Sequence, residues 1–256
     1  MADTCELFPE GAAIVIGGSG GIGRAICEAL ARAGSDVVFT YRSNEQVARE
    51  LSDAIVAMGR RALAIKLELT DRAACRAAID RAATETGRIH TLIIAVGADI
   101  SMTYTADIDP DEWDRTINGD LTGPFNVLMP AIPYLRKEGG SILALTSAGL
   151  KRFPPKDILS VVPKAGLETL LRGVAREEGR FGIRANMIGL GVVDTGLFDR
   201  LRERLTPAFV DAMKKNVPLG RFANAQEVAD LTVFLCSVKA SLITGQSIAL
   251  DGGFSV

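Results

Sequence analysis

The chain is poor in the residues that build metal centres and disulfide frameworks. It has a single histidine, His90, and four cysteines, Cys5, Cys27, Cys75 and Cys236, which lie far apart and form no C-x-x-C pair. Zinc sites need several histidine or cysteine ligands at close spacing, and disulfide frameworks are typical of short secreted chains. We therefore expect no metal site, and we expect the thiols to be isolated.

The chain also lacks an excess of positive charge and any long apolar run. Its 29 basic and 31 acidic residues give a formal net charge of -2 and are spread along the sequence, so no basic stripe is present to neutralise a nucleic-acid backbone. No apolar run approaches the roughly 20 residues that span a bilayer, and the amino terminus has no basic segment leading into an apolar one. We expect no nucleic-acid or membrane partner, and a reducing, cytoplasmic setting.

What the chain does have is an alternation of short branched apolar runs and longer amphipathic stretches. Its 256 residues, 48% of them hydrophobic, suit one domain over residues 1–256. The alternation is typical of an α/β fold, a Rossmann-type doubly wound parallel sheet with helices on both faces. Seven strands are expected at 12–16, 36–41, 61–66, 91–96, 141–146, 183–188 and 247–250. Helices are expected from the turn after the first strand to about residue 33, and at 44–58, 71–86, 111–135, 160–179 and 225–237.

The polar stretch 195–219 has only an uncertain helix. It would suit a mobile flap over a pocket, and a solvated surface insertion is the alternative.

A glycine-rich turn, Gly17 to Gly23 (GGSGGIG), follows the first expected strand and opens a helix. The free N–H groups and positive dipole end of such a helix can face a pyrophosphate. Glycine is needed because a Cβ would block either the tight turn or the approach of the phosphate. The turn predicts nucleotide binding, and a tight turn without a ligand is the alternative.

The residue that ends the second strand selects between the two nicotinamide dinucleotides. An acidic group there would bind the ribose hydroxyls and repel a 2′-phosphate. Arg42 stands there instead, followed by Ser43, and a guanidinium can pair with that phosphate. This favours NADP(H) over NAD(H), the alternative being a solvated arginine beside a helix start.

Together with further segments, these motifs resemble the short-chain dehydrogenase/reductase family, and most closely its 3-oxoacyl-acyl-carrier-protein reductases, over nearly the whole chain. Residues 16–23 match the family's TGxxxGIG turn, and residues 113–123 match its segment from a tryptophan to Asn-Leu-x-x-Gly. Ser147 matches the catalytic serine, residues 160–164 match Tyr-x-x-x-Lys, residues 190–195 match PGxxxT, and residues 244–246 and 251–254 match the carboxyl end.

The resemblance implies an oxidoreductase that acts on a small carbonyl/alcohol substrate, assembled as a homo-oligomer, a tetramer or dimer, through helices 111–135 and 160–179. It implies active-site positions at Ser147, Lys164, Asp120 and Ser160. It implies cofactor contacts at Gly17, Ser19, Gly21, Ile22, Gly23, Arg42, Ser43, Glu68, Leu69, Gly97, Lys164, Val193 and Thr195.

Departures from the family pattern concentrate on proton transfer. Ser160 replaces the tyrosine that donates a proton to the substrate, and Asp120 replaces the asparagine that supports the lysine. The NNAG segment becomes residues 94–97 (IAVG), the Asp after the third strand becomes Glu68, and the proline of the nicotinamide-side loop becomes Leu190. The cofactor features are better retained than the proton-transfer features.

A serine hydroxyl cannot replace the phenol alone, because it is a far weaker acid. Losing a positioned general acid removes roughly 10² to 10⁴ in rate. Three substitutes are open: Asp120 and Lys164 titrating together and passing a proton through water and Ser160, Tyr104 swinging in from its loop, or Lys164 acting directly. The first is ranked highest because both residues align with active-site positions.

The roles of Ser147 and of a basic cluster near it each have two possible interpretations. Ser147 would hydrogen-bond the substrate oxygen, or would only cap a turn. Lys151, Arg152 and Lys156 would attract an acidic substrate, such as an acyl carrier or carboxylate, or form a solvated loop. The two function classes that remain are an NADP(H)-dependent oxidoreductase with an altered proton route, and a protein that binds cofactor or metabolite without redox turnover, as a sensor, partner subunit or non-redox catalyst.

Overall fold

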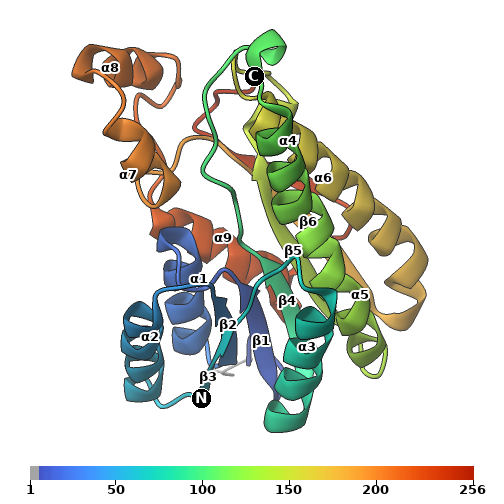
Figure 1. The fold of residues 1–256 in the computed structure, drawn as a ribbon. Helices are drawn as coiled ribbons and strands as arrows, with labels where there is room; N and C mark the ends of the chain where they lie inside the picture. The colour runs from blue at the N-terminus through green and yellow to red at the C-terminus, as the bar shows by residue number, and fades with distance from the viewer. Residues whose placement is uncertain (1–5) are drawn as a thin grey trace.

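A seven-stranded parallel sheet forms the centre of the molecule, as the sequence predicts (Figure 1). The computed structural model describes residues 6–256. The strands lie in the order β3-β2-β1-β4-β5-β6-β7, and each neighbouring pair is parallel. They are β1 (Ala12–Ile16), β2 (Asp36–Tyr41), β3 (Ala62–Lys66), β4 (Ile89–Ile94), β5 (Gly140–Ser147), β6 (Ile183–Leu190) and β7 (Ser247–Leu250).

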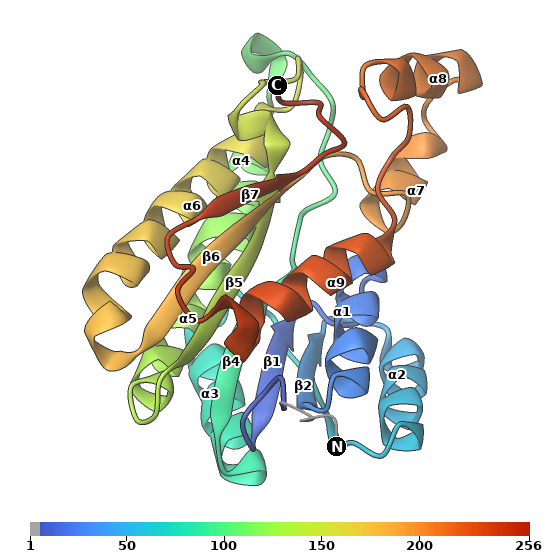
Figure 2. The ribbon, with the colours of Figure 1, turned by 180° about the vertical axis from the view of Figure 1, so that it is seen from behind.

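Helices cover both faces of the sheet, because alternate strand residues point to opposite sides. On one face, Ala13 and Val15 of β1 pack against α1 (Gly21–Arg32), α2 (Glu45–Ala57) and α9 (Ala225–Cys236). On the other face, Ile14 and Ile16 pack with α3 (Arg72–Thr86), α5 (Gly123–Leu135) and α6 (Ile158–Glu178). The two views of the ribbon show these two layers (Figures 1 and 2). The short 3-10 turns are η1 (Thr105–Asp107), η3 (Ala148–Leu150), η4 (Gly179–Phe181) and η5 (Val238–Ala240).

The fourth strand lies two residues earlier than the predicted 91–96. Ile89 pairs with Ala12, and the ladder with β1 ends at Ile94. Beyond it, the backbone leaves the sheet and the Val96 carbonyl accepts a hydrogen bond from the Lys164 ammonium. The predicted end was wrong because an apolar run does not show at which residue the backbone carbonyl stops bonding the neighbouring strand and accepts a hydrogen bond from a side chain.

The predicted single helix 111–135 is interrupted. It consists of α4 (Pro110–Ile117), a π-helical turn η2 (Asn118–Thr122) and α5. Pro124 has no N–H to give to the carbonyl of Asp120, four residues earlier, so regular α-helical bonding is not possible there. A π turn adds a residue to the turn and re-aims its side chains. Asp120 lies within it and is buried.

The stretch 195–219 holds two helices, α7 (Leu197–Arg202) and α8 (Pro207–Lys215), where only an uncertain one was expected. They stand beside the carboxyl edge of the sheet (Figure 1). Their own apolar cluster joins Phe198, Val210, Val217 and Phe222. Packing between these segments supplies the stability that the polar local sequence does not show.

Three cysteines, Cys27, Cys75 and Cys236, are buried free thiols, and Cys5 lies outside the described residues. Among residues 6–256, no helix combines the length and the apolar character needed to cross a bilayer.

Candidate functional site

The residues predicted from the sequence to bind cofactor follow the carboxyl ends of the strands, which meet along one edge of a parallel sheet. The strand order places the segments after β3, β2, β1, β4, β5 and β6 in a row along that edge. Beside β1 the chain order reverses, since β2 and β3 lie on one side and β4 to β7 on the other. Ligands of doubly wound sheets bind at such a switch point.

Gly17 and Gly23 make the turn after β1 as tight as a dinucleotide cradle requires. Gly17 has φ +84°, and its N–H donates to Thr40 Oγ1 at 2.9 Å. A Cβ on Gly23 would lie 2.2 Å from the Gly17 carbonyl oxygen, so a larger residue cannot fit. Gly20 starts α1 without any side-chain cap. The free N–H groups of this 12-residue helix therefore remain for an anion, with Ser19 and Ile22 half-buried beside them.

The adenosine end of the predicted site is open. Arg42 and Ser43 are exposed directly after β2, and Glu68 is exposed after β3. Glu45, three residues after Arg42, is already paired with Arg49 at 2.6 Å. Leu69 is half-buried and contacts the position of Gly123, where a Cβ would lie 2.8 Å from it.

Lys164 and Asp120 meet at the centre of the edge, both nearly buried. Lys164 Nζ donates to the Val96 carbonyl at 2.6 Å and lies 3.5 Å from Asp120 Oδ2. The same Oδ2 accepts the Ala98 N–H at 3.0 Å. An ammonium has three protons, so Lys164 keeps one for a further acceptor. Of the three proton routes, this is the one whose residues the structure brings into contact.

Ser147 both caps a turn and keeps a free donor. At the end of β5, its Oγ accepts the Gly149 N–H at 3.0 Å and caps η3. The hydroxyl hydrogen is not used by that bond, so it can still be donated to a substrate oxygen. The two interpretations of Ser147 are therefore compatible.

Ser160 lies half-buried in the first turn of α6, one turn before Lys164. Residues four apart lie on one face of a helix, so both belong to the face that reaches Val96 and Asp120. The sequence analysis missed Asp157, the N-cap of the same helix. Burial raises the pKa of Asp157 to about 6. The signal that could have found it is a carboxylate three residues before Ser160.

The segment between β6 and α7, with the start of α7, lies against the glycine turn and the loop after β4. Thr195 and Gly97 are both predicted cofactor contacts. A Cβ added to Gly21 would lie 2.4 Å from Thr195 Oγ1, and a Cβ added to Gly97 would lie 3.1 Å from Leu197 Cδ1. Val193 is buried and bridges Ala223.

Two arginines of the segment 195–219 join it to the loop after β4. Arg200 and Arg204 form ion pairs with Asp99 of the loop after β4, at 3.6 and 3.4 Å. Sequence spacing gave no signal for these contacts, which join segments about a hundred residues apart.

The predicted basic cluster is divided. Lys156 lies over the Tyr104 ring, 4.6 Å from its centre, and Arg152 donates to the Phe254 carbonyl at 2.9 Å. Lys151 is exposed. Tyr104 itself is 61% exposed, which places its phenol in solvent and weakens the second proton route.

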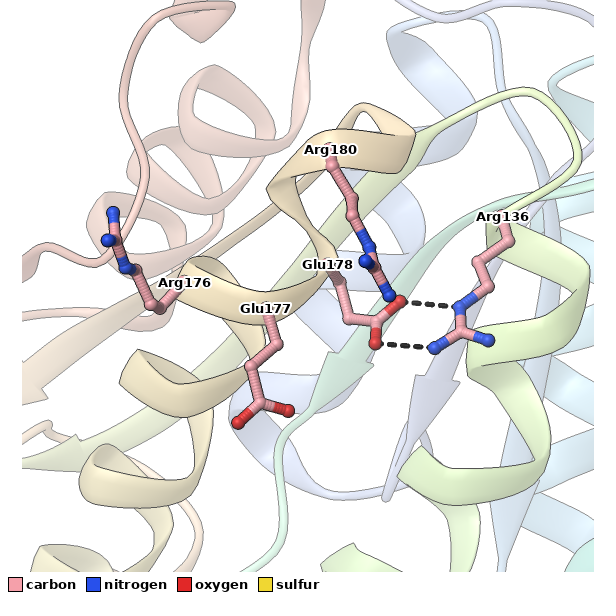
Figure 3. A pocket seen from close by; sticks show the side chains of 5 residues that line it. All are labelled: Arg136, Arg176, Glu177, Glu178 and Arg180. Carbon is pink, nitrogen blue, oxygen red and sulfur yellow. Dashed lines mark hydrogen bonds and ion pairs between the residues drawn. The ribbon is translucent and has the colours of Figure 1, made fainter.

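A separate pocket lies at the carboxyl-terminal end of α6, away from every predicted site residue (Figure 3). Arg136 of α5 holds Glu178 of α6 through two hydrogen bonds of 2.6 Å. Arg176, Glu177 and Arg180 complete its lining. No residue predicted to bind cofactor lines this pocket, so it is separate from the candidate site at the sheet edge.

Comparison with known proteins agrees with this geometry. Residues 17–255 match the sequence pattern of a family described as enoyl-(acyl carrier protein) reductase. Cis-4-hydroxycyclohexanecarboxylate dehydrogenase of Sinomonas cyclohexanicum is 34% identical over 98% of this chain and 98% of its own. The 3-oxoacyl-[acyl-carrier-protein] reductase FabG of Staphylococcus aureus (strain N315) is 32% identical over 94% and 96%.

Solved structures show the same fold. A short-chain dehydrogenase/reductase from Serratia marcescens superimposes with a TM-score of 0.89 and 30% identity, covering 96% of this chain and 98% of its own. A blue fluorescent protein from a metagenomic library, in complex with NADPH, gives a TM-score of 0.87 and 30% identity over 96% and 98%. The Rossmann-type fold predicted from the sequence is confirmed.

Proposed function

The chain belongs to the short-chain dehydrogenase/reductase family, a family of nicotinamide-dependent oxidoreductases with small-molecule substrates, and from this premise we propose that it transfers a hydride between NADP(H) and a carbonyl/alcohol pair. The observation that carries the proposal is the buried Lys164 ammonium, held by Val96 and Asp120 beside the glycine cradle. A buried, positioned ammonium with a free N–H can donate a hydrogen bond to a ribose hydroxyl or to a substrate oxygen.

The chain's own residues have distinct tasks in this proposal. The turn from Gly17 to Gly23 would hold the pyrophosphate, and a bound nicotinamide would supply or accept the hydride. Ser147 would donate its free hydroxyl hydrogen to the substrate oxygen, and Lys164 would orient the ribose. Asp120 fixes the ammonium, and the proton path runs past Ser160 in place of a tyrosine.

Arg42 supports the preference for NADP(H). It is exposed at the end of β2, and Glu45, three residues further on, is already paired with Arg49. A free guanidinium can take a 2′-phosphate in two parallel hydrogen bonds. One structural relative holds NADPH.

The substrate class follows from charge near the cleft and from the relatives. The exposed ammonium of Lys151 and that of Lys156 border the loop after β5. Curated relatives act on 4-hydroxycyclohexanecarboxylate or on 3-oxoacyl carrier proteins, and both substrates bring acidic groups. We propose an acidic carbonyl or alcohol substrate.

A second candidate is cofactor binding without turnover. Ser160 favours it, because no phenol is present at the usual donor position. The replacement Ser160→Tyr separates the two: activity that appears only in this variant supports a protein that has given up redox turnover.

We also propose that the α5 and α6 faces join copies of the chain. Phe125 and Met129 of α5 are 39% and 46% exposed. A groove beside them is lined by Ile132, Leu170 and Val174. Sedimentation of a monomer at micromolar concentration would contradict this.

Calorimetric titration with NADPH and NADH tests the cofactor assignment. We expect tight NADPH binding that Arg42→Ala weakens about 10- to 100-fold, equivalent to about 1.4 to 2.7 kcal/mol, with NADH unaffected. Arg49→Ala is the matched control, since Arg49 is a nearby exposed arginine that already binds Glu45. Failure of both nucleotides to bind would refute the redox function.

The Asp120 assignment is tested by two variants. Asp120→Ala removes the partner of a buried ammonium, and we expect turnover to fall about 100-fold. Asp120→Asn keeps a hydrogen-bond acceptor and should retain most of the turnover. Unchanged turnover in Asp120→Ala would show that turnover does not depend on Asp120 fixing the Lys164 ammonium.

A further inference from the structure

Asp157 occupies a position where an aspartate would ordinarily cap a helix, and it does not do so. N-cap aspartates accept an N–H from the first turn through their side chains. In α6 the Asp157 side chain makes no such bond, although its backbone carbonyl accepts the N–H groups of Ser160 and Val161 at 3.1 and 2.9 Å, as the carbonyl of an N-cap residue does. The carboxyl group is therefore not used as a cap, and the residue is half-buried.

The carboxyl group heads the face of α6 that forms the site. Asp157, Ser160 and Lys164 are spaced by three and then four residues, so they succeed one another along one side of the helix. Lys164 reaches Val96 and Asp120. At Gly149, a Cβ would meet Val161 at 2.8 Å and Ser147 Oγ at 3.0 Å, which places the first turn of α6 against the catalytic-serine position.

The charged side chains of the surrounding elements are engaged elsewhere. In the preceding loop, Lys156 lies over the Tyr104 ring, and Arg152 donates to the Phe254 carbonyl. Lys151 interacts electrostatically with the Asp251 carboxylate. On α6 and η2, Lys164 and Asp120 hold each other. At the carboxyl end of the chain, Asp251 accepts the N–H groups of Gly253 and Ser255.

Without a cationic partner, burial disfavours the charged carboxylate, and it raises the pKa of Asp157 to about 6. A general acid works best when its pKa lies near the operating pH. Lys156, next to it, has φ +69° and is the only non-glycine residue with a positive φ among residues 6–256. A left-handed conformation is costly for such a residue, and here it fixes how the chain enters Asp157.

We propose that Asp157 is the catalytic acid that replaces the missing tyrosine and delivers a proton to the substrate oxygen. The inference rests on the proposed reductase function. A bound reduced nicotinamide would supply the hydride that adds to the carbonyl carbon, leaving the oxidised cofactor. The π-electron pair of the carbonyl moves to its oxygen, which takes the carboxyl proton of Asp157. Solvent then reprotonates the carboxylate, so the proton count balances.

The test compares Asp157→Asn in two backgrounds, the natural chain and Ser160→Tyr. Reduction of 4-oxocyclohexanecarboxylate, the ketone related to the alcohols of two relatives, and of a 3-oxoacyl thioester is followed by NADPH oxidation. We expect Asp157→Asn to lower kcat about 100-fold with Ser160, and less than about 3-fold with Ser160→Tyr, because the phenol then supplies the proton. A loss of less than about 2-fold in the natural chain would overturn the proposal.

The pH profile adds a readout that a structural role would not move. Reduction needs the protonated acid, so kcat should be constant below about pH 6 and fall tenfold per pH unit above it, and Asp157→Asn should remove this dependence. Asp53→Asn, an exposed aspartate on α2, is the control. Unchanged NADPH affinity in Asp157→Asn would show that the variant is folded.

A second readout is independent of turnover. In the cofactor-free protein, the infrared carboxylic-acid band that Asp157→Asn removes should titrate near pH 6. A band titrating near 4, the ordinary range, overturns the inference even if the reductase function holds. Bound NADPH with no oxidation in either background refutes the reductase function, and the infrared band then decides separately whether Asp157 is an acid of the required strength.

Discussion

At the turn after β1 the candidate site is made of backbone, whereas on the β4–β5–β6 side it is made of side chains. Gly17 and Gly23 form the cradle through φ angle and close approach. Across the switch point, Ser147, Lys164 and Asp120 come from three separate elements. A cradle of backbone has little freedom to change, because a Cβ at Gly17 or Gly23 would clash, while a side-chain site can exchange one functional group for another.

This difference explains where the chain departs from its family. The glycines of the turn keep the pattern, and the substitutions Ser160, Asp120 and Leu190 fall on the side-chain half, whereas Glu68, on the other half, keeps the acidic charge of the family's aspartate. The buried titratable groups show the same contrast. His90 near the start of β4 has partners for both ring nitrogens, Ser35 Oγ at 3.1 Å and Thr91 Oγ1 at 2.9 Å. Asp157 is half-buried without a charged partner, as a reactive group would be.

Replacing Gly23 by Ala should have the largest effect. Its Cβ would lie 2.2 Å from the Gly17 oxygen and 2.9 Å from the Gly18 Cα, so the backbone of the cradle must shift. We expect the free energy of unfolding to fall by about 3 kcal/mol or more and NADPH binding to be lost. Gly20→Ala is the control, since its nearest neighbour would lie at 3.4 Å. Equal behaviour of both variants in urea unfolding and calorimetry would show that the cradle is not rigid.

Acid should destabilise the protein through His90. Burial, followed by the charge of Arg88, lowers its pKa from 6.5 to about 4. The unfolded chain therefore takes up a proton first, and stability is lost as pH falls from about 6.5 to 4, by about 3 kcal/mol at most. Urea unfolding across this range measures the loss, and His90→Gln should flatten it. A flat profile in the natural chain would mean that His90 can be charged while folded.

Ser160→Tyr restores a phenol on the side-chain half. We expect kcat for ketone reduction with NADPH to change less than about 3-fold at pH 6, where Asp157 already supplies the proton, and to rise about 100-fold at pH 8, where Asp157 is ionised and the phenol is not. Steady-state kcat measures the gain, and Ser160→Phe, which has the ring but no hydroxyl, is the control. An equal response of the two variants would indicate a packing effect.

The ionised Asp157 carboxylate should destabilise the fold at neutral pH. Its pH dependence is opposite to that of His90, because here stability falls as pH rises. Its pKa is raised from 3.8 to about 6 by burial, so stability is greatest below about pH 4 and is lost as pH rises to 6. Asp157→Asn should therefore stabilise the protein at pH 8 by about 1 to 2 kcal/mol, after discounting for partial exposure. Thermal unfolding at pH 4 and 8 tests this, and destabilisation at pH 8 would contradict the assignment.

Asp99→Asn should have the smallest effect. It weakens the contacts of Arg200 and Arg204 across the cleft, and exposed ion pairs are worth about 0 to 1 kcal/mol. We expect little change in stability and an NADPH release rate raised about 2- to 5-fold by stopped-flow fluorescence. Asp211→Asn, in α8, is the control. Slower release would show that these ion pairs do not hold the helices over the cofactor edge.

Local sequence was sufficient for the elements whose stability is local. Apolar alternation located all seven strands, and the glycine turn with Arg42 located the predicted cofactor half. The fourth strand was misplaced at its ends, and the helix 111–135 was predicted without its interruption at 118–122, because Val96 and Asp120 depart from regular structure to reach Lys164. The sequence predicted only one uncertain helix where α7 and α8 lie, because their apolar cluster forms from residues brought together by folding.

The sequence by itself determined the family, the parallel sheet and the loss of the tyrosine, because these depend on residue type, periodicity and spacing along one chain. Only the tertiary structure decided that Lys164, Asp120 and the Val96 carbonyl meet, that Leu197 lies against Gly97, and that Asp157 is half-buried without a charged partner. The reason is physical: hydrogen bonding, burial and the pKa of a carboxyl group depend on what surrounds a side chain, and in this protein those surroundings come from segments far apart in sequence.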